Sequence, residues 1–205
     1  MGPIDLSSWM MGVNATELPS PELMEAEVWA TPLEVDARLG RLLWKENARL
    51  KDGPCFHVIN PDSQLMAILK PDTQAMYVKE EVVNSNGMKG WQLQRRPAAA
   101  FNAPPGYRRT TLPAVLWRFA LFDPEGSKVL PKRYGVLPLA LRQLPNLTRD
   151  MVPVRQVKLM QVLSRQACTF TELRNITQLS DEQLHRDLGA LYLTGCLRTL
   201  GLPGA

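Results

Sequence analysis

Residues 153–200 read PVRQVKLMQVLSRQACTFTELRNITQLSDEQLHRDLGALYLTGCLRTL, and this stretch decides the fold of the last quarter of the 205-residue chain. Its apolar residues recur at helical spacing in three short runs, which predicts three amphipathic helices. Thr169 and Ser180 each stand three residues before a Glu or Gln, the pattern of a capping box at the start of a helix. Gly195 is placed to end the third helix, and residues 196–200 are expected to form a short strand.

This order of helix, turn, helix, turn, helix and strand resembles the winged helix-turn-helix superfamily, over residues 153–200 only. The resemblance is one of architecture, and it implies a domain that docks on DNA or on protein. Only five residues follow Leu200, too few for the returning strand of a wing. We therefore expect residues 196–200 to pair with residues near Cys168.

The third predicted helix is a poor candidate for reading duplex DNA. Proteins that bind DNA neutralise its phosphates with lysine and arginine. Here three carboxylates oppose one arginine on the expected outward face, which draws on Asp181, Glu182, His185, Arg186, Asp187 and Thr194. We therefore expect this module to contact protein or to pack on the rest of the chain. The candidate protein-contact residues are Asp181, Glu182, His185 and Arg186, together with Trp9 in the leader.

The residues before this module predict a mixed domain, so the fold class of the whole chain is α+β. Thr31 is a candidate cap for a helix that runs to about Leu50. Two turns of related sequence, at residues 61–64 and 71–74, separate three β-prone runs and predict an antiparallel meander. Val82-Val83 and residues 91–93 are candidate further strands. Residues 114–122 predict a buried helix, and residues 136–141 an extended segment in which Pro138 disfavours a central strand. The predicted divisions are a leader at 1–20, a mixed domain at 21–150 and the C-terminal module at 151–205.

Charge is unevenly distributed along the chain, whose formal net charge is +4. Residues 1–90 hold 8 Lys and Arg against 13 Asp and Glu, residues 91–158 hold 12 against 3, and residues 159–205 hold 4 against 4. A basic middle region indicates a polyanionic partner or an acidic surface on the same protein. Arginine pairs bracket a Pro- and Ala-rich stretch at 94–111, which is predicted to be a loop. Its arginines either clamp phosphates and stack on bases, or are solvated or paired with the acidic first part of the chain. The polyanion-binding candidates are Arg95, Arg96, Arg108, Arg109, Lys132, Arg133 and Arg142.

Catalytic chemistry is weakly represented in the sequence. The chain has two histidines, His57 and His185, and neither stands in a pattern that supplies a base with an orienting carboxylate. Its three cysteines lack metal-ligand or redox spacing and are typical of reduced core residues in a cytosolic protein. We expect no enzyme activity, no cofactor and no metal site.

A regulatory or adaptor role through protein contacts is the function that these patterns favour, in a cytoplasmic protein of bacterial style. No window approaches 18 apolar residues, so no membrane partner is expected. Two alternatives remain open: a DNA- or RNA-binding transcriptional regulator that uses residues 91–158, and a subunit of a larger assembly that buries the Trp9 segment. The sequence does not indicate an oligomeric state.

Overall fold

The computed structural model describes residues 32–50, 53–80 and 90–201. These residues form two compact units, the first ending at Asp123 and the second beginning at Pro124. The boundary between the two units therefore lies earlier in the chain than residue 150, which is the boundary predicted from the sequence. The reason is that residues 139–141 pair with the chain's last strand, so the stretch after Pro124 already belongs to the C-terminal unit. The Trp9 leader and the Thr31 cap lie outside the described residues.

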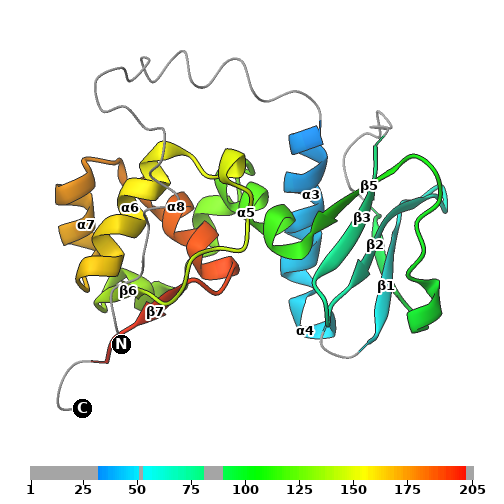
Figure 1. Cartoon of the computed structure of the whole chain (residues 1–205), viewed down its shortest axis with the longest axis horizontal. Coiled ribbons are helices and arrows are strands. Elements are labelled where there is room, and N and C mark those ends of the chain that lie inside the picture. The colour runs from blue at the N-terminus through cyan, green and yellow to red at the C-terminus, as the bar shows by residue number, and fades with distance from the viewer. Residues whose placement is uncertain (1–31, 51–52, 81–89, 202–205) are drawn as a thin grey trace. The chain divides into compact units, whose positions relative to one another are not determined.

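The first unit is a five-stranded antiparallel sheet with helices on one face (Figure 1). Its strands lie in the order β4-β1-β2-β3-β5, with every neighbouring pair antiparallel. The elements are α3 (Pro32–Lys45), α4 (Asn47–Leu50), β1 (Cys55–Ile59), β2 (Leu65–Lys70), β3 (Ala75–Lys79), β4 (Gln92–Arg96), the short 3-10 helix η1 (Ala98–Ala100), β5 (Tyr107–Thr111) and α5 (Leu112–Phe122).

The predicted meander is confirmed as β1, β2 and β3. The prediction of a loop at 94–111 is wrong at its two ends, where β4 and β5 form, whereas residues 97–106 form no strand. β4 extends to Arg96 and pairs with β1, while β5 pairs with β3 at the opposite edge of the sheet. Residues 97–106 connect these two edges. Strand pairing of this kind joins residues far apart in the sequence, so local turn and proline patterns do not reveal it. The candidate strand at Val82-Val83 lies outside the described residues.

The core of the first unit lies between the sheet and the helices α3 and α5. Side chains from every second strand position, such as Phe56, Leu69 and Met76, pack with Leu39 and Val115 in one cluster. The predicted helix over residues 114–122 is confirmed as α5. It starts two residues earlier than predicted, because Thr111 caps it by accepting a hydrogen bond from the Ala114 backbone N–H at 3.3 Å.

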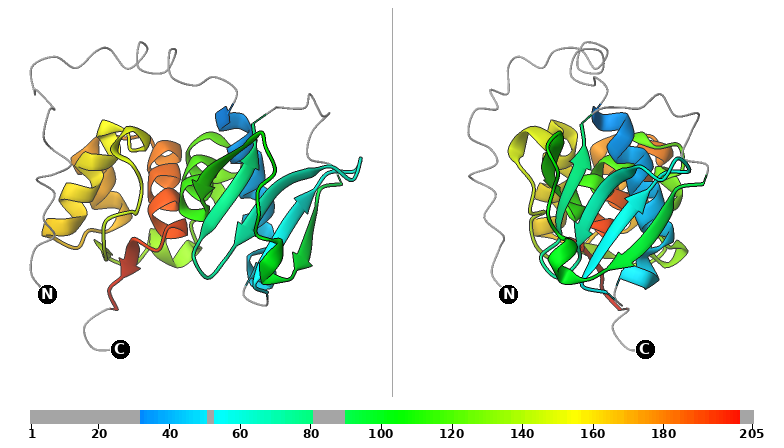
Figure 2. Two further views of the ribbon diagram at one scale, coloured as in Figure 1. Left: turned by 45° about the vertical axis from the view of Figure 1, so that its right-hand side comes forward. Right: turned by 90° about the vertical axis from the view of Figure 1, so that its right-hand side faces the viewer.

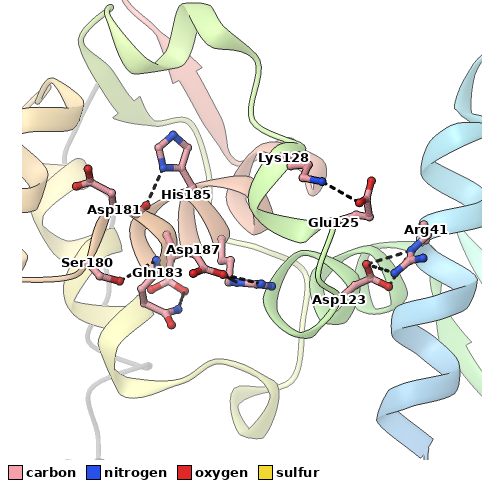
Figure 3. A network of polar contacts seen from close by, with 11 residues as sticks. Arg41, Asp123, Glu125, Lys128, Ser180, Asp181, Gln183, His185 and Asp187 are labelled. Atoms are coloured by element: carbon pink, nitrogen blue, oxygen red, sulfur yellow. Dashed lines mark hydrogen bonds and ion pairs between the residues drawn. The ribbon is translucent and has the colours of Figure 1, made fainter.

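An ion pair ties α3 to the end of α5 (Figure 3). The Arg41 guanidinium contacts both carboxylate oxygens of Asp123, with Nη2 to Oδ1 at 2.6 Å and Nε to Oδ2 at 3.0 Å. Asp123 is buried, so this bidentate contact replaces the hydrogen bonds to water that its carboxylate loses on folding.

The second unit contains three helices and a pair of short strands. Its elements are the 3-10 helices η2 (Gly126–Lys128), η3 (Lys132–Gly135) and η4 (Arg149–Met151), the helices α6 (Val154–Arg165), α7 (Phe170–Thr177) and α8 (Asp181–Leu193), and the strands β6 (Leu139–Leu141) and β7 (Leu197–Thr199). The three predicted helices are therefore confirmed. Figure 2 shows α6, α7 and α8 from two further directions.

Both predicted helix starts are confirmed in the second unit. Thr169 forms a complete capping box with Glu172, whose carboxylate accepts from the Thr169 backbone N–H at 2.7 Å. These hydrogen bonds lower the pKa of the Glu172 carboxyl. Ser180 accepts from the backbone N–H of Gln183 at 3.2 Å, while the Gln183 side-chain amide donates to Asp187.

The predicted pairing of residues 196–200 with the region of Cys168 is wrong, because β6 lies between them. Leu139 exchanges two backbone hydrogen bonds with Cys168, at 2.8 and 2.9 Å. On its other side β6 pairs with β7, antiparallel. Pro138 stands just before β6, as expected of a residue that cannot donate to a ladder, and its carbonyl accepts from the Leu200 N–H at 2.8 Å.

Among the helices of the described residues, none combines the length and the apolar character needed to cross a membrane. The three cysteines, Cys55, Cys168 and Cys196, are buried and unpaired, as predicted.

Candidate functional site

Four of the predicted protein-contact residues lie together at the N-terminal end of α8. Asp181 and Glu182 are exposed in its first turn, where carboxylates are favoured by the helix dipole. Arg186 Nη2 contacts Glu182 Oε1 at 3.0 Å, and Arg174 of α7 contacts Asp181 Oδ1 at 3.2 Å. We call Arg174, Asp181, Glu182, His185 and Arg186 the α8 charge cluster.

His185 is a packed member of this cluster. Its Nδ1 lies 2.7 Å from the backbone carbonyl oxygen of Asp181 (Figure 3), and its ring lies against Phe170 with centroids 4.5 Å apart. The ring is thus held by one backbone group and one aromatic face. This arrangement orients the imidazole, and within the described residues no carboxylate pairs with it as a catalytic histidine would require.

One sequence-based orientation in this unit is wrong, and one apolar residue of α7, Ile176, is half exposed. Asp187, predicted to point outward, is fully buried. Asp187 stands three residues after Leu184 and four before Leu191, both buried, so the helical period itself places it on the inner stripe of α8. That spacing could have predicted its burial from the sequence.

Asp187 is the centre of a buried polar network that joins α6 to α8 (Figure 3). Its carboxylate accepts from Gln183 Nε2 at 2.9 Å, from Gln156 Nε2 at 3.2 Å and from Arg155 Nε at 3.3 Å. Gln156 is fully buried as well. Neither Arg155 nor Gln156 was predicted as a site residue, because each lies about thirty positions from Asp187 in the sequence.

Burial raises the pKa of the Asp187 carboxyl, while Arg155 and the two amides oppose the change. Within the described residues, Gln156 Oε1 is a buried acceptor without a hydrogen-bond donor. The raised pKa means that the Asp187 carboxyl takes up a proton more readily than an exposed aspartate does.

Acidification is expected to stabilise the wild-type protein relative to an Asp187→Asn variant. A carboxyl whose pKa rises on folding binds more protons in the folded chain, between its unfolded pKa of about 3.9 and its folded pKa. Its contribution to the free energy of unfolding therefore falls as the pH rises through that window. Glu172, with a lowered pKa, acts in the opposite sense, and its effect cancels between the two proteins. Urea unfolding of both proteins from pH 7 to 4 measures the difference, and parallel profiles would contradict this assignment.

The predicted phosphate clamp is not formed by the arginine pairs. Arg95 and Arg96 lie on β4 and Arg108 and Arg109 on β5, at opposite edges of the sheet. Four strand spacings separate those edges, roughly 19 Å. The register also divides each pair: Arg95 and Arg108 stand opposite core residues, and Arg96 and Arg109 are on the other face. The remaining candidates belong to the second unit, where Lys132 and Arg133 lie on η3 and Arg142 follows β6.

Residues with catalytic potential in the first unit are held by backbone contacts or by burial. His57 Nε2 lies 3.1 Å from the carbonyl oxygen of Ala100. Burial raises the pKa of the Cys55 thiol, which disfavours the nucleophilic thiolate. Among the described residues, no group of three or more His, Cys, Asp and Glu side chains is arranged to hold a metal ion.

The fold defines a protein of mixed helix and antiparallel sheet, consistent with the α+β class, in which a sheet unit precedes a helical unit. Comparison of the chain with protein-family models, with curated proteins and with solved structures finds no match. Its function must therefore be inferred from its own residues.

Proposed function

We propose that this chain is a non-enzymatic regulatory or adaptor protein that binds a partner protein through its C-terminal unit, used as a winged-helix-like module. The observation that carries the proposal is the α8 charge cluster. It presents both signs of charge on an exposed helix end, and α7 beside it carries the half-exposed Ile176. Mixed charges with an apolar residue are typical of surfaces that select a protein partner.

The same cluster offers little attraction for duplex DNA. Because Asp187 is buried, the exposed charges at this end of α8 are Asp181 and Glu182, each paired with an arginine. The carboxylates that contact Arg174 and Arg186, at 3.2 and 3.0 Å, balance their charge, so the α8 charge cluster has no excess of cations. DNA binding requires such an excess. This balance supports protein contact over groove reading.

Reversing the two carboxylates is expected to abolish partner binding. An Asp181→Lys/Glu182→Lys variant removes the carboxylates that contact Arg174 and Arg186. It turns a balanced surface into a basic one, which repels a partner surface that is complementary to the wild-type charges. The tagged protein is purified from its native cell with nuclease treatment, and co-purifying proteins are quantified. We expect a protein retained by the wild type to fall at least tenfold with the variant.

The matched control is Asp62→Lys/Asp150→Lys, which makes the same change in net charge at two exposed positions that are not part of the α8 charge cluster. Melting curves verify that both variants remain folded. A partner that binds wild type and Asp181→Lys/Glu182→Lys equally, or that leaves the wild type when nuclease is added, would overturn the proposal.

A further inference from the structure

The face of the sheet turned away from α3 and α5 carries a set of residues that are distinct from the α8 charge cluster. Directly opposed residues of neighbouring strands share a face. The register therefore places Gln94, His57, Ile68, Tyr77 and Arg109 in one row across β4, β1, β2, β3 and β5. A second row on the same face runs through Arg96, Cys55, Lys70, Ala75 and Thr111. We call this the outer face; Figure 2, right, looks onto it with α3 behind the sheet.

The outer face has an excess of positive charge. Arg96 and Arg109 are exposed at its two edges, and Lys70 and Lys79 lie between them on β2 and β3. One carboxylate, Asp72, contacts Lys70 with Nζ to Oδ2 at 3.7 Å, and its side chain is 63% exposed. A pair this exposed contributes little and leaves Lys70 able to exchange partners. The four cations are spread over four strands, as an extended polyanion requires.

Aromatic rings lie among these cations. The connection between β4 and β5 crosses the outer face, where Phe101 stacks on Tyr77 with ring centroids 5.1 Å apart and planes at 39°. The contact of His57 Nε2 with the Ala100 carbonyl oxygen fixes the same segment. Ile68, between His57 and Tyr77 in its row, is fully buried, whereas Tyr77 and Phe101 remain partly exposed. The crossing segment is therefore anchored and presents ring surface between the edge arginines.

We propose that the outer face binds single-stranded nucleic acid, with unpaired bases on Phe101 and Tyr77 and phosphates on Arg96, Arg109, Lys79 and Lys70. Stacking on an aromatic platform inside a basic surface is the physical basis of single-strand binding, since every base has a stacking face. A duplex keeps its bases stacked on one another, so the aromatic pair gains nothing from it. This site belongs to the first unit and is independent of the protein-binding role of α8.

Fluorescence anisotropy of the full chain with labelled single-stranded oligonucleotides tests the proposal. We expect binding to oligouridylate or oligothymidylate at about 50 mM salt, at least tenfold tighter than to a duplex of the same length. Each phosphate contact in a single strand contributes about −0.7 to the slope of log affinity against log salt. An Arg96→Gln/Arg109→Gln variant should therefore reduce the steepness of this slope by about 1.4. A Phe101→Leu variant should weaken binding about fivefold or more at every salt concentration.

The matched control is Arg95→Gln/Lys132→Gln, which removes the same amount of charge. Arg95 is exposed on β4 but belongs to the opposite face of the sheet, and Lys132 is an exposed residue of the second unit. This variant should bind like the wild type. The proposal fails if single strands do not bind at low salt, if duplex binds equally well, or if this control loses as much affinity as Arg96→Gln/Arg109→Gln. Equal competition by a polyanion without bases, such as heparin, would also overturn it, because stacking would then contribute nothing.

Discussion

An Asp187→Ala variant is expected to lose about 3 kcal/mol of the second unit's unfolding free energy, at the lower end of the range for breaking a buried charged pair. The substitution leaves three donors without their acceptor, on Arg155, Gln156 and Gln183. The Arg155 side chain is 35% exposed, so water can hydrate part of its guanidinium group. Gln156 is fully buried, so its amide stays without a hydrogen-bond partner. The loss amounts to a large share of the stability of a small domain.

Amide hydrogen exchange measures this effect in each unit separately. Protection of α6 and α8 should fall in Asp187→Ala, while protection of the first unit's sheet should stay as in the wild type. Asp187→Asn, which keeps an acceptor oxygen for Gln183, should lose less, about 1–2 kcal/mol. The control is Asp181→Ala, an exposed carboxylate on the same helix, with an expected loss below about 1 kcal/mol. Unchanged protection of α8 in Asp187→Ala would show that the network does not hold the helices together.

The helices of the second unit could be predicted because the residues that cap each helix start are close together in the sequence. Thr169 reaches Glu172, and Ser180 reaches Gln183, within a single turn, so the sequence contains both partners of each cap. The strand pairing could not be predicted in the same way. β6 is hydrogen-bonded to β7, which lies more than fifty residues later in the sequence. No turn links the two strands directly, so the local sequence does not indicate that they pair.

The same holds for the candidate sites: residues close together in the sequence could be grouped, whereas residues brought together by strand pairing could not. Asp181, Glu182, His185 and Arg186 could be grouped from the sequence, because they lie within a few residues of one another on one helix, whereas Arg174 on α7 was not predicted. The phosphate clamp that the sequence suggested is not formed, since Arg95 and Arg109 occupy opposite edges of the sheet. Only the register shows that Arg96 and Arg109 share a face with Tyr77, while Arg95 and Arg108 do not.

A Gly40→Ala variant is expected to destabilise the first unit, although alanine favours a helix over glycine by about 1 kcal/mol. A Cβ atom at Gly40 would lie 2.4 Å from Phe119 Cβ and 2.8 Å from the Val115 carbonyl oxygen, so α3 and α5 touch there at backbone distance. Neither neighbour is the free end of a flexible side chain, and Phe119 is fully buried against Trp44. The two helices would have to separate by about 1 Å to restore an ordinary carbon–carbon contact of about 3.5 Å. Overpacking of a core costs about 1–3 kcal/mol or more.

The loss from separating the helices should exceed the gain in helix propensity, because Leu39, Leu43 and Val115 would also lose packing against the sheet. Gly40→Val adds a larger, β-branched side chain and should abolish cooperative unfolding of the first unit. Gly135→Ala is the matched control, since a Cβ there meets no atom within 4 Å, and its expected effect is within about 0.5 kcal/mol. Urea unfolding curves of the three variants provide the comparison. A Gly40→Ala protein as stable as the wild type would mean that α3 and α5 tolerate a wider separation, and that their close contact does not fix how they cover the inner face of the sheet.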